Sequence, residues 1–296
     1  MAIYSYLQGG LGNQMFQYAI ARALSERYQV AFALNRTWFD APQEHATPRE
    51  LQLNLLKIQD IAFVSTAFPT KPSKLKRALE KIVPSRSMII YQKNAFDFDP
   101  QLFRLRGMQQ RDLYLSGYWQ GFPYIDSIRT KLQQEFQTAS AISSAYQAYL
   151  QEINSTESVM VHIRRGDYVH SPAAAQFHGN LPLSYYQAAI QELLAIKPNA
   201  HFFIFSDDLP WAKKALPKNI SQTFIEHTTP NGSAAQELQL MFACKHHIIA
   251  NSSLSWWGAW LKKDVAGLVY APNRWINDST LNLSSLLPAE WKRISI

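Results

Sequence analysis

Residues 201–227 read HFFIFSDDLPWAKKALPKNISQTFIEH, and this stretch decides the fold. Its apolar start predicts a buried strand, the segment from about Pro210 predicts a short helix, and QTFIEH predicts a second strand. The alternation extends to both sides, from the strand SVMVHIRR that begins at Ser158 to the strand GLVYAP that ends at Pro272. Strict alternation with apolar strands is typical of a parallel sheet covered by helices on both faces. The second half is therefore expected to be a doubly wound, Rossmann-type domain.

The N-terminal stretch contains one further unit of this kind. Residues 2–7 predict a strand, and apolar positions at helical spacing from Gln14 to about Tyr28 predict a helix. The glycines between them, in GGLGNQ, allow either a tight turn with positive φ or the approach of a phosphate to backbone N–H groups. The dinucleotide fingerprint is incomplete, because Met15 replaces its third glycine. The loop residues expected to contact an anionic ligand are Gly10, Gly12, Asn13 and Gln14.

Length and composition fit two α/β halves. The chain has 296 residues, of which 47% are hydrophobic, and this is enough to build a core in each of two modest domains. A polar stretch, QEINSTES at residues 151–158, marks the expected boundary. We therefore expect an N-terminal α/β domain at residues 1–150, which carries the glycine-rich loop, and a C-terminal Rossmann-like domain at residues 151–296.

Charge and cysteine content restrict the partners and the compartment. A formal charge of +7 suits an anionic ligand, a nucleic acid or an acidic membrane face. The Lys and Arg residues are scattered rather than interleaved with aromatic side chains, so a nucleic-acid partner is not expected. Cys244 is the only cysteine, which excludes an intramolecular disulfide, and the sequence shows no signal peptide or membrane-spanning run. We expect a cytoplasmic protein.

A basic segment, PTKPSKLKRALEKIVPSRS at residues 69–87, reads as a short helix between loops. Such a run is usually a solvated face, and contact with an anionic membrane surface is the alternative. In the second case the protein attaches peripherally to the inner membrane face through basic side chains that include Lys74, Lys76, Arg77 and Lys81.

Polar residues follow several of the predicted strands, at the positions where ligands bind in open α/β sheets. The stretch HIRRGD places His162 and Arg164 on one face of a strand and Arg165 on the other. Arginine forks match phosphate oxygens and neutralise a diphosphate without a metal, so we expect Arg164 to clamp a pyrophosphate. Arg165 either joins this clamp or pairs with an acidic residue and holds the loop.

Asp207 and Asp208 follow the next strand. A carboxylate pair can hold a divalent cation against phosphates, but these two are adjacent in sequence, and an arginine clamp makes a metal unnecessary. A carboxylate here can instead accept hydrogen bonds from the N1–H and N2–H groups of guanine, which adenine cannot offer. One of the two is alternatively the N-cap of the helix near Pro210. No metal site is expected.

The stretch NSSLSWWGAW brings an amide and several hydroxyls to the start of a further helix. Asn251 ends the preceding strand, and Ser252 and Ser253 can cap the helix, bind a phosphate or do both. Together with Arg164 and the glycine-rich loop, these residues predict several anion-binding groups around one diphosphate.

Four stretches in this order and spacing, GGLGNQMFQYA, VHIRRGDYV, FFIFSDD and CKHHIIANSSLSWWGAWL, closely resemble glycosyltransferase family 11, the α-1,2-fucosyltransferases, in a bacterial form. The resemblance extends from residue 8 to about Asp278 and is weakest over residues 40–110. It implies a GT-B-like pair of Rossmann-type domains and GDP-β-L-fucose as the donor. It also implies a galactose-terminated oligosaccharide or lipid-linked glycan as the acceptor, inversion at the anomeric carbon and no metal cofactor.

The resemblance implies roles for the residues above. Arg164 would grip the β-phosphate of the donor with assistance from His162, and an aspartate of the SDD sequence would read the guanine. Ser252 and Ser253 would bind the diphosphate. The loop at residues 9–14 would close over it from the N-terminal domain, which would lie on the acceptor side.

Two functional expectations complete this interpretation. Asp167 is a candidate for the general base that deprotonates the acceptor hydroxyl, and an ion pair with an arginine is its alternative role. The expected process is the assembly of an O-antigen or related surface-glycan precursor. The rival function is a non-catalytic protein that binds GDP or a nucleotide sugar, and turnover distinguishes the two.

Overall fold

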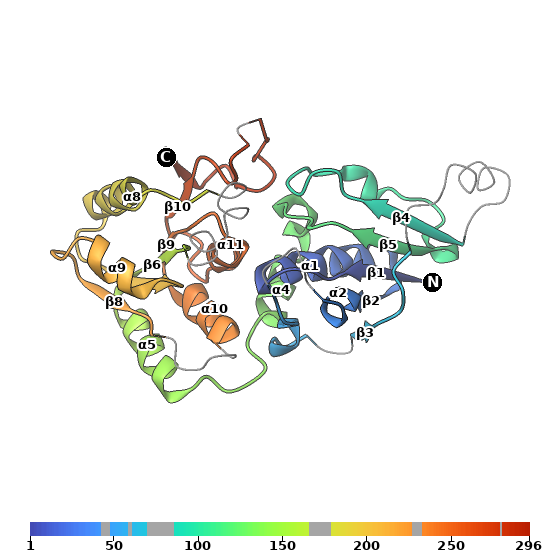
Figure 1. The fold of residues 1–296 in the computed structure, drawn as a ribbon, viewed down its shortest axis with the longest axis horizontal. Helices are drawn as coiled ribbons and strands as arrows, with labels where there is room; N and C mark the ends of the chain where they lie inside the picture. The colour runs from blue at the N-terminus through green and yellow to red at the C-terminus, as the bar shows by residue number, and fades with distance from the viewer. Residues whose placement is uncertain (43–47, 59–60, 70–85, 166–178, 227–232, 279) are drawn as a thin grey trace. The chain divides into compact units, whose positions relative to one another are not determined.

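The computed structural model describes residues 1–42, 48–58, 61–69, 86–165, 179–226, 233–278 and 280–296 (Figure 1). These form two compact units, the first made of residues 1–54 and 58–135 and the second of residues 55–57 and 136–296. The expected boundary between residues 150 and 151 falls inside helix α5 (Ser144–Ser155), which belongs to the second unit. The stretch QEINSTES reads as a linker because of its polarity, but it is the end of this helix and the start of the next strand.

The first unit is built on a five-stranded parallel sheet with the order β3-β2-β1-β5-β4. Its strands are β1 (Ala2–Tyr6), β2 (Ala31–Asn35), β3 (Ala62–Val64), β4 (Ser87–Tyr91) and β5 (Asp112–Ser116). Its α-helices are α1 (Leu11–Tyr28), α2 (Thr37–Asp40) and α4 (Arg129–Glu135). The 3-10 helices are η1 (Leu53–Leu55), whose last residue belongs to the second unit, η2 (Pro100–Phe103), η3 (Met108–Gln110), η4 (Phe122–Tyr124) and η5 (Asp126–Ile128).

Helix α1 is the central helix of the first unit. Gly9 has a φ of 78°, a left-handed conformation that glycine adopts without strain, and Gly10 is the extended N-cap of the helix. Most side chains along the helix are buried, among them Met15 and Phe16, which are fully buried. The glycine-rich loop therefore ends in a helix that is anchored in the core.

The second unit is built on a six-stranded parallel sheet with the order β11-β10-β9-β6-β7-β8. Its strands are β6 (Glu157–Ile163), β7 (Ala200–Ser206), β8 (Gln222–Phe224), β9 (His246–Ile248), β10 (Val269–Pro272) and β11 (Lys292–Ile294). Besides α5, its helices are α8 (Leu183–Ile196), α9 (Leu209–Ala215), α10 (Ser233–Ala243) and α11 (Ser253–Trp260). The sequence prediction of a doubly wound parallel domain is confirmed.

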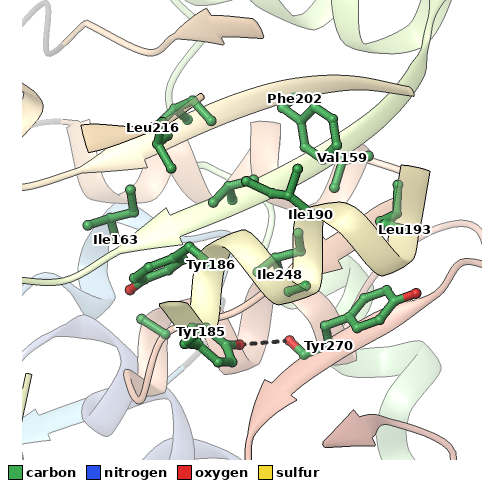
Figure 2. Packing of buried hydrophobic residues seen from close by; sticks show 14 of the residues in the cluster. Val159, Ile163, Tyr185, Tyr186, Ile190, Leu193, Phe202, Leu216, Ile248 and Tyr270 are labelled. Atoms are coloured by element: carbon green, nitrogen blue, oxygen red, sulfur yellow. Dashed lines mark hydrogen bonds between the residues drawn. The ribbon is translucent and has the colours of Figure 1, made fainter. Parts of the chain in front are cut away.

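Alternate residues of β6 face different helices. Val159 and Ile163 pack in the hydrophobic cluster with Tyr185 and Ile190 of α8, as Figure 2 shows. Met160 faces the opposite side of the sheet and packs against α11. Its sulfur atom lies 3.4 Å from the position that a Cβ atom would take on Gly258 of that helix. The sheet is thus covered on both faces, and side chains that continue the register of Met160 point away from α8.

Glu157, at the amino end of β6, is held by three basic side chains at the edge opposite the predicted ligand site. Its carboxylate lies 2.9 Å from His246 Nε2, from Lys197 Nζ and from Lys245 Nζ. The hydrogen bond from His246, followed by those from the two lysines, lowers the pKa of Glu157 from 4.5 to about 2. This carboxylate therefore stabilises the folded state above about pH 4.5, and the contribution is lost as the pH falls toward 2.

Glu157→Gln is expected to lower the free energy of unfolding by about 1 kcal/mol at pH 7, because the network is partly exposed to solvent. The difference from the wild-type protein should shrink below pH 4. Urea denaturation at several pH values measures both effects. Glu226→Gln is the matched control. Glu226 pairs with Lys213, and both side chains are about half exposed, so the loss of this ion pair should cost less stability. A loss of equal size in both variants would contradict a special role for Glu157.

The basic segment predicted to touch a membrane lies largely outside the described residues. Lys74, Lys76, Arg77 and Lys81 all belong to that undescribed part. Among the residues that the structure does describe, no helix is long and apolar enough to cross a membrane.

Candidate functional site

Arg164 and Asp207 lie at the carboxyl ends of two neighbouring strands of the second unit. Strands β6 and β7 pair with Ile163 opposite Ser206, so the residues that follow are brought together. Nη1 of Arg164 lies 3.1 Å from Oδ2 of Asp207, and the backbone N–H of Arg165 donates to Oδ1 of Asp207 at 2.7 Å. Both side chains of the ion pair are 24% exposed, so solvent and a ligand can reach them.

Arg165 points to the opposite side of the strand end, as strand alternation predicts. Its Nε lies 3.4 Å from Oδ2 of Asp208, and its guanidinium lies 4.0 Å from the ring centroid of Trp211. Asp208 also accepts the N–H of Trp211 and is the N-cap of α9. Arg165 therefore has an acidic partner, as its alternative interpretation expects, and Asp208 caps a helix.

His162 is buried in β6, two residues before Arg164, with only 6% of its surface exposed. Burial lowers the pKa of His162 to about 4, although the nearby carboxylate of Asp207 acts in the opposite direction. The imidazole is consequently neutral near pH 7. Its Nδ1 atom has no hydrogen-bond partner among the residues that the structure describes.

The residues after β9 include a buried amide, that of Asn251, and the hydroxyls of Ser252 and Ser253 at the start of a helix. Asn251 is 3% exposed, and its Nδ2 donates to the carbonyl oxygens of Trp275 and Gly179 at 3.1 and 3.3 Å. Ser252 is the N-cap of α11, and its hydroxyl makes no capping hydrogen bond. Ser253 is the first residue of the helix and is partly exposed. Of the three predicted ligand residues, the two serines keep accessible positions, and the amide nitrogen of Asn251 is used within the fold.

In the first unit, Gln14 occupies a position that does not suit a ligand contact. It is fully buried, its Nε2 donates to two carbonyl oxygens, and its Oε1 accepts two backbone N–H groups. A side-chain amide has two donors and two acceptor lone pairs, so the hydrogen-bonding capacity of Gln14 is saturated within the fold. These hydrogen bonds give Gln14 a role in shaping the loop, and its contact with a ligand stays a prediction.

The other loop residues remain at the start of α1. Asn13 Oδ1 accepts a hydrogen bond from Gln120 Nε2 at 2.8 Å. Gly10 has open space where a Cβ would be, and the first turn of the helix contains no acidic side chain. Gly12 is buried within this turn. The N-terminus of α1 therefore carries the positive end of the helix dipole with no acidic side chain in its first turn.

Asp167, the candidate general base, lies outside the described residues. Within the described part of the chain, no group of three or more His, Cys, Asp or Glu side chains is arranged to hold a metal ion.

The sequence interpretation did not single out two partners of the site residues. The guanidinium of Arg165 lies over the ring of Trp211. The sequence feature that could have indicated this partner is the position of an aromatic residue three residues after the N-cap Asp208. Gln120 donates a hydrogen bond to Asn13, and the two residues are 107 positions apart in the sequence. No local sequence pattern predicts such a contact.

The chain has two units, and each is built on a parallel sheet. This is the architecture of the GT-B-like fold. The second unit carries Arg164, Asp207 and the serines at the start of α11 at the carboxyl edge of its sheet. Fucosyltransferase NodZ from Bradyrhizobium has this fold: it matches with a TM-score of 0.52 and 14% identity over 87% of this chain and 91% of NodZ. The GT-B-like fold expected from the sequence is confirmed.

The chain matches Glycosyl transferase family 11 over residues 2–295 and belongs to that family. It is 34% identical to an alpha-1,2-colitosyltransferase of Escherichia coli over 99% of this chain and 98% of the relative. It is 31% identical to the O-antigen biosynthesis glycosyltransferase WbnK of Escherichia coli over 96% of this chain and 99% of the relative. The protein is thus a glycosyltransferase, and the family resemblance read from the sequence is confirmed.

Proposed function

We propose that the protein transfers L-fucose from GDP-β-L-fucose to the 2-hydroxyl of a terminal galactose, with inversion and without a metal. The observation that carries the proposal is the placement of Arg164 at the carboxyl edge of β6, ion-paired with Asp207. The neighbouring strand β9 leads to Ser252 and Ser253 at the N-terminus of α11. A guanidinium and a helix N-terminus are both suited to the two phosphates of GDP.

The proposed reaction is a single displacement with inversion. The galactose hydroxyl oxygen forms a bond to the anomeric carbon of fucose while the bond to the β-phosphate oxygen breaks, and GDP leaves with the electron pair. Arg164 and the N-terminus of α11 stabilise the negative charge that develops on the leaving diphosphate, a contribution of about 10²- to 10³-fold per preorganised donor. The hydroxyl proton passes to a base, for which Asp167 is the proposed group.

The remaining predicted ligand residues have supporting parts in this proposal. His162 is neutral near pH 7 and acts as a hydrogen-bonding group next to Arg164 rather than as a cation. In the first unit, the N-terminus of α1 with Gly10, Gly12 and Asn13 is proposed to bind an anionic group of a substrate.

The first experiment tests the donor, the linkage and the metal together. The purified protein is incubated with GDP-fucose, lactose or N-acetyllactosamine, and EDTA, and GDP release and the product linkage are followed by NMR. We expect an α-1,2-fucosylated product at an undiminished rate. An activated colitose is tested in parallel, because a relative is named for that sugar. Donor binding without turnover on any galactoside would support the rival function, a non-catalytic nucleotide-sugar-binding protein.

We also propose that the enzyme acts in the cytoplasm on an O-antigen or related lipid-linked precursor, in keeping with the name of its relative WbnK. Peripheral attachment to the inner membrane face through the basic segment would bring it to such an acceptor. Replacing Lys74, Lys76, Arg77 and Lys81 with Gln is expected to weaken binding to anionic vesicles by about 4 kcal/mol in total, at roughly 1 kcal/mol per basic residue. A cosedimentation assay with phosphatidylglycerol vesicles measures this, and unchanged binding would refute the attachment.

A further inference from the structure

The carboxylate of Asp207 makes two contacts that together fix the position of Arg164. One oxygen, Oδ2, lies 3.1 Å from Nη1 of Arg164, and the other, Oδ1, accepts the backbone N–H of Arg165 at 2.7 Å. One side chain thus holds the guanidinium of Arg164 and also the backbone that follows it. We infer, on the basis of the proposed function, that Asp207 is a positioning residue that orients Arg164 toward the diphosphate and does not read the guanine base.

The directions of the two oxygens support this role. A carboxylate that reads guanine directs its oxygens toward the N1–H and N2–H groups of the base. In this structure both oxygens of Asp207 are instead directed toward donors of the protein, and the in-register pairing of β6 with β7 places those donors beside it. A charge-assisted pair of this kind restricts the rotamers of a long side chain before the ligand arrives.

The carboxylate of Asp208 stabilises the end of β6 next to the Arg164–Asp207 ion pair. Asp208 Oδ1 accepts the N–H of Trp211 at 3.1 Å, and Oδ2 lies 3.4 Å from Nε of Arg165. The guanidinium of Arg165 lies over the ring of Trp211. The two adjacent aspartates therefore have different partners. Asp208 contacts Arg165 and the first turn of α9, and Asp207 contacts the guanidinium of Arg164.

A double-mutant cycle tests the inference. Affinities for GDP and ADP, together with kcat and KM, are measured for the wild-type protein, Asp207→Asn, Arg164→Ala and the double variant. Asparagine can still accept the N–H of Arg165 but carries no charge for Arg164. We expect Asp207→Asn to lower kcat and GDP affinity about tenfold in the wild-type background and by less than about twofold in the Arg164→Ala background. The preference for GDP over ADP should not change.

Controls separate positioning from folding and from base recognition. Melting temperatures verify that each variant folds, and Asp207→Ser, which also removes the charge and keeps an acceptor oxygen, replaces Asp207→Asn if the latter does not. Asp208→Asn is the matched control, and its effect should be the same with and without Arg164. Loss of the preference for GDP over ADP in Asp207→Asn, or an equal effect in both backgrounds, would overturn the inference. Failure of the folded wild-type protein to bind GDP would instead overturn the proposed function on which it rests.

Discussion

Replacing Arg164 with alanine is expected to lower kcat by about 10²- to 10³-fold and to weaken GDP binding, while the fold survives. The physical reason is the position of the guanidinium at the carboxyl edge of β6, where it would face the negative charge of the leaving diphosphate. Steady-state kinetics with GDP-fucose gives kcat and KM, and calorimetry gives the affinity for GDP. Arg164→Lys keeps the charge but not the planar fork, so it should recover only part of the rate.

Arg165→Ala is the matched control for this prediction. The two arginines are adjacent in sequence, yet the guanidinium of Arg165 stacks on Trp211 and pairs with Asp208 on the other side of the strand end. Its removal should lower the free energy of unfolding by about 1 kcal/mol and reduce kcat less than tenfold. Turnover near the wild-type rate in Arg164→Ala, or a larger loss in Arg165→Ala, would remove Arg164 from the clamp.

The contrast between these two arginines was readable from the sequence because it depends on strand alternation alone. A strand places Arg164 on the face of His162 and Arg165 on the opposite face, whatever the rest of the chain does. The alternation of apolar strands and helices in the second half was predictable for the same reason, since both periods are local properties of the chain. The sequence alone could not predict the aromatic partner of Arg165, because it does not show that α9 places Trp211 beside this arginine.

Long-range contacts explain what the sequence interpretation missed. Strands β3 and β4 of the first unit lie in residues 40–110, where the family resemblance is weakest. Their side chains show no regular alternation of buried and exposed positions, so no local period predicts these strands. The role of Asn251 depends on Gly179 and Trp275, which are 72 and 24 residues away. Polar residues near a predicted ligand site look alike in sequence whether they bind the ligand or brace the loops around it.

Gln14 is the sharpest case of such a brace, and its replacement by leucine is expected to lower the free energy of unfolding by about 2–4 kcal/mol. Its Nε2 donates to the carbonyl oxygens of Gly9 and Glu50 at 2.8 and 2.9 Å. Its Oε1 accepts the N–H groups of Gln52 and Leu53 at 2.9 and 3.0 Å. Leucine has a similar size but leaves all four backbone groups without this partner. Urea denaturation of the two proteins measures the loss.

The same variant distinguishes a brace from a ligand residue in the glycine-rich loop. A ligand role for Gln14 predicts weaker substrate binding at nearly unchanged stability, whereas a brace predicts a large loss of stability. Asn13→Ala is the comparison, because Asn13 is only partly buried and its side-chain oxygen accepts a hydrogen bond from Gln120. Its stability cost should be about 1 kcal/mol. If Gln14→Leu costs no more than Asn13→Ala, the saturated amide does not organise the loop, and Gln14 returns to the candidates for substrate binding.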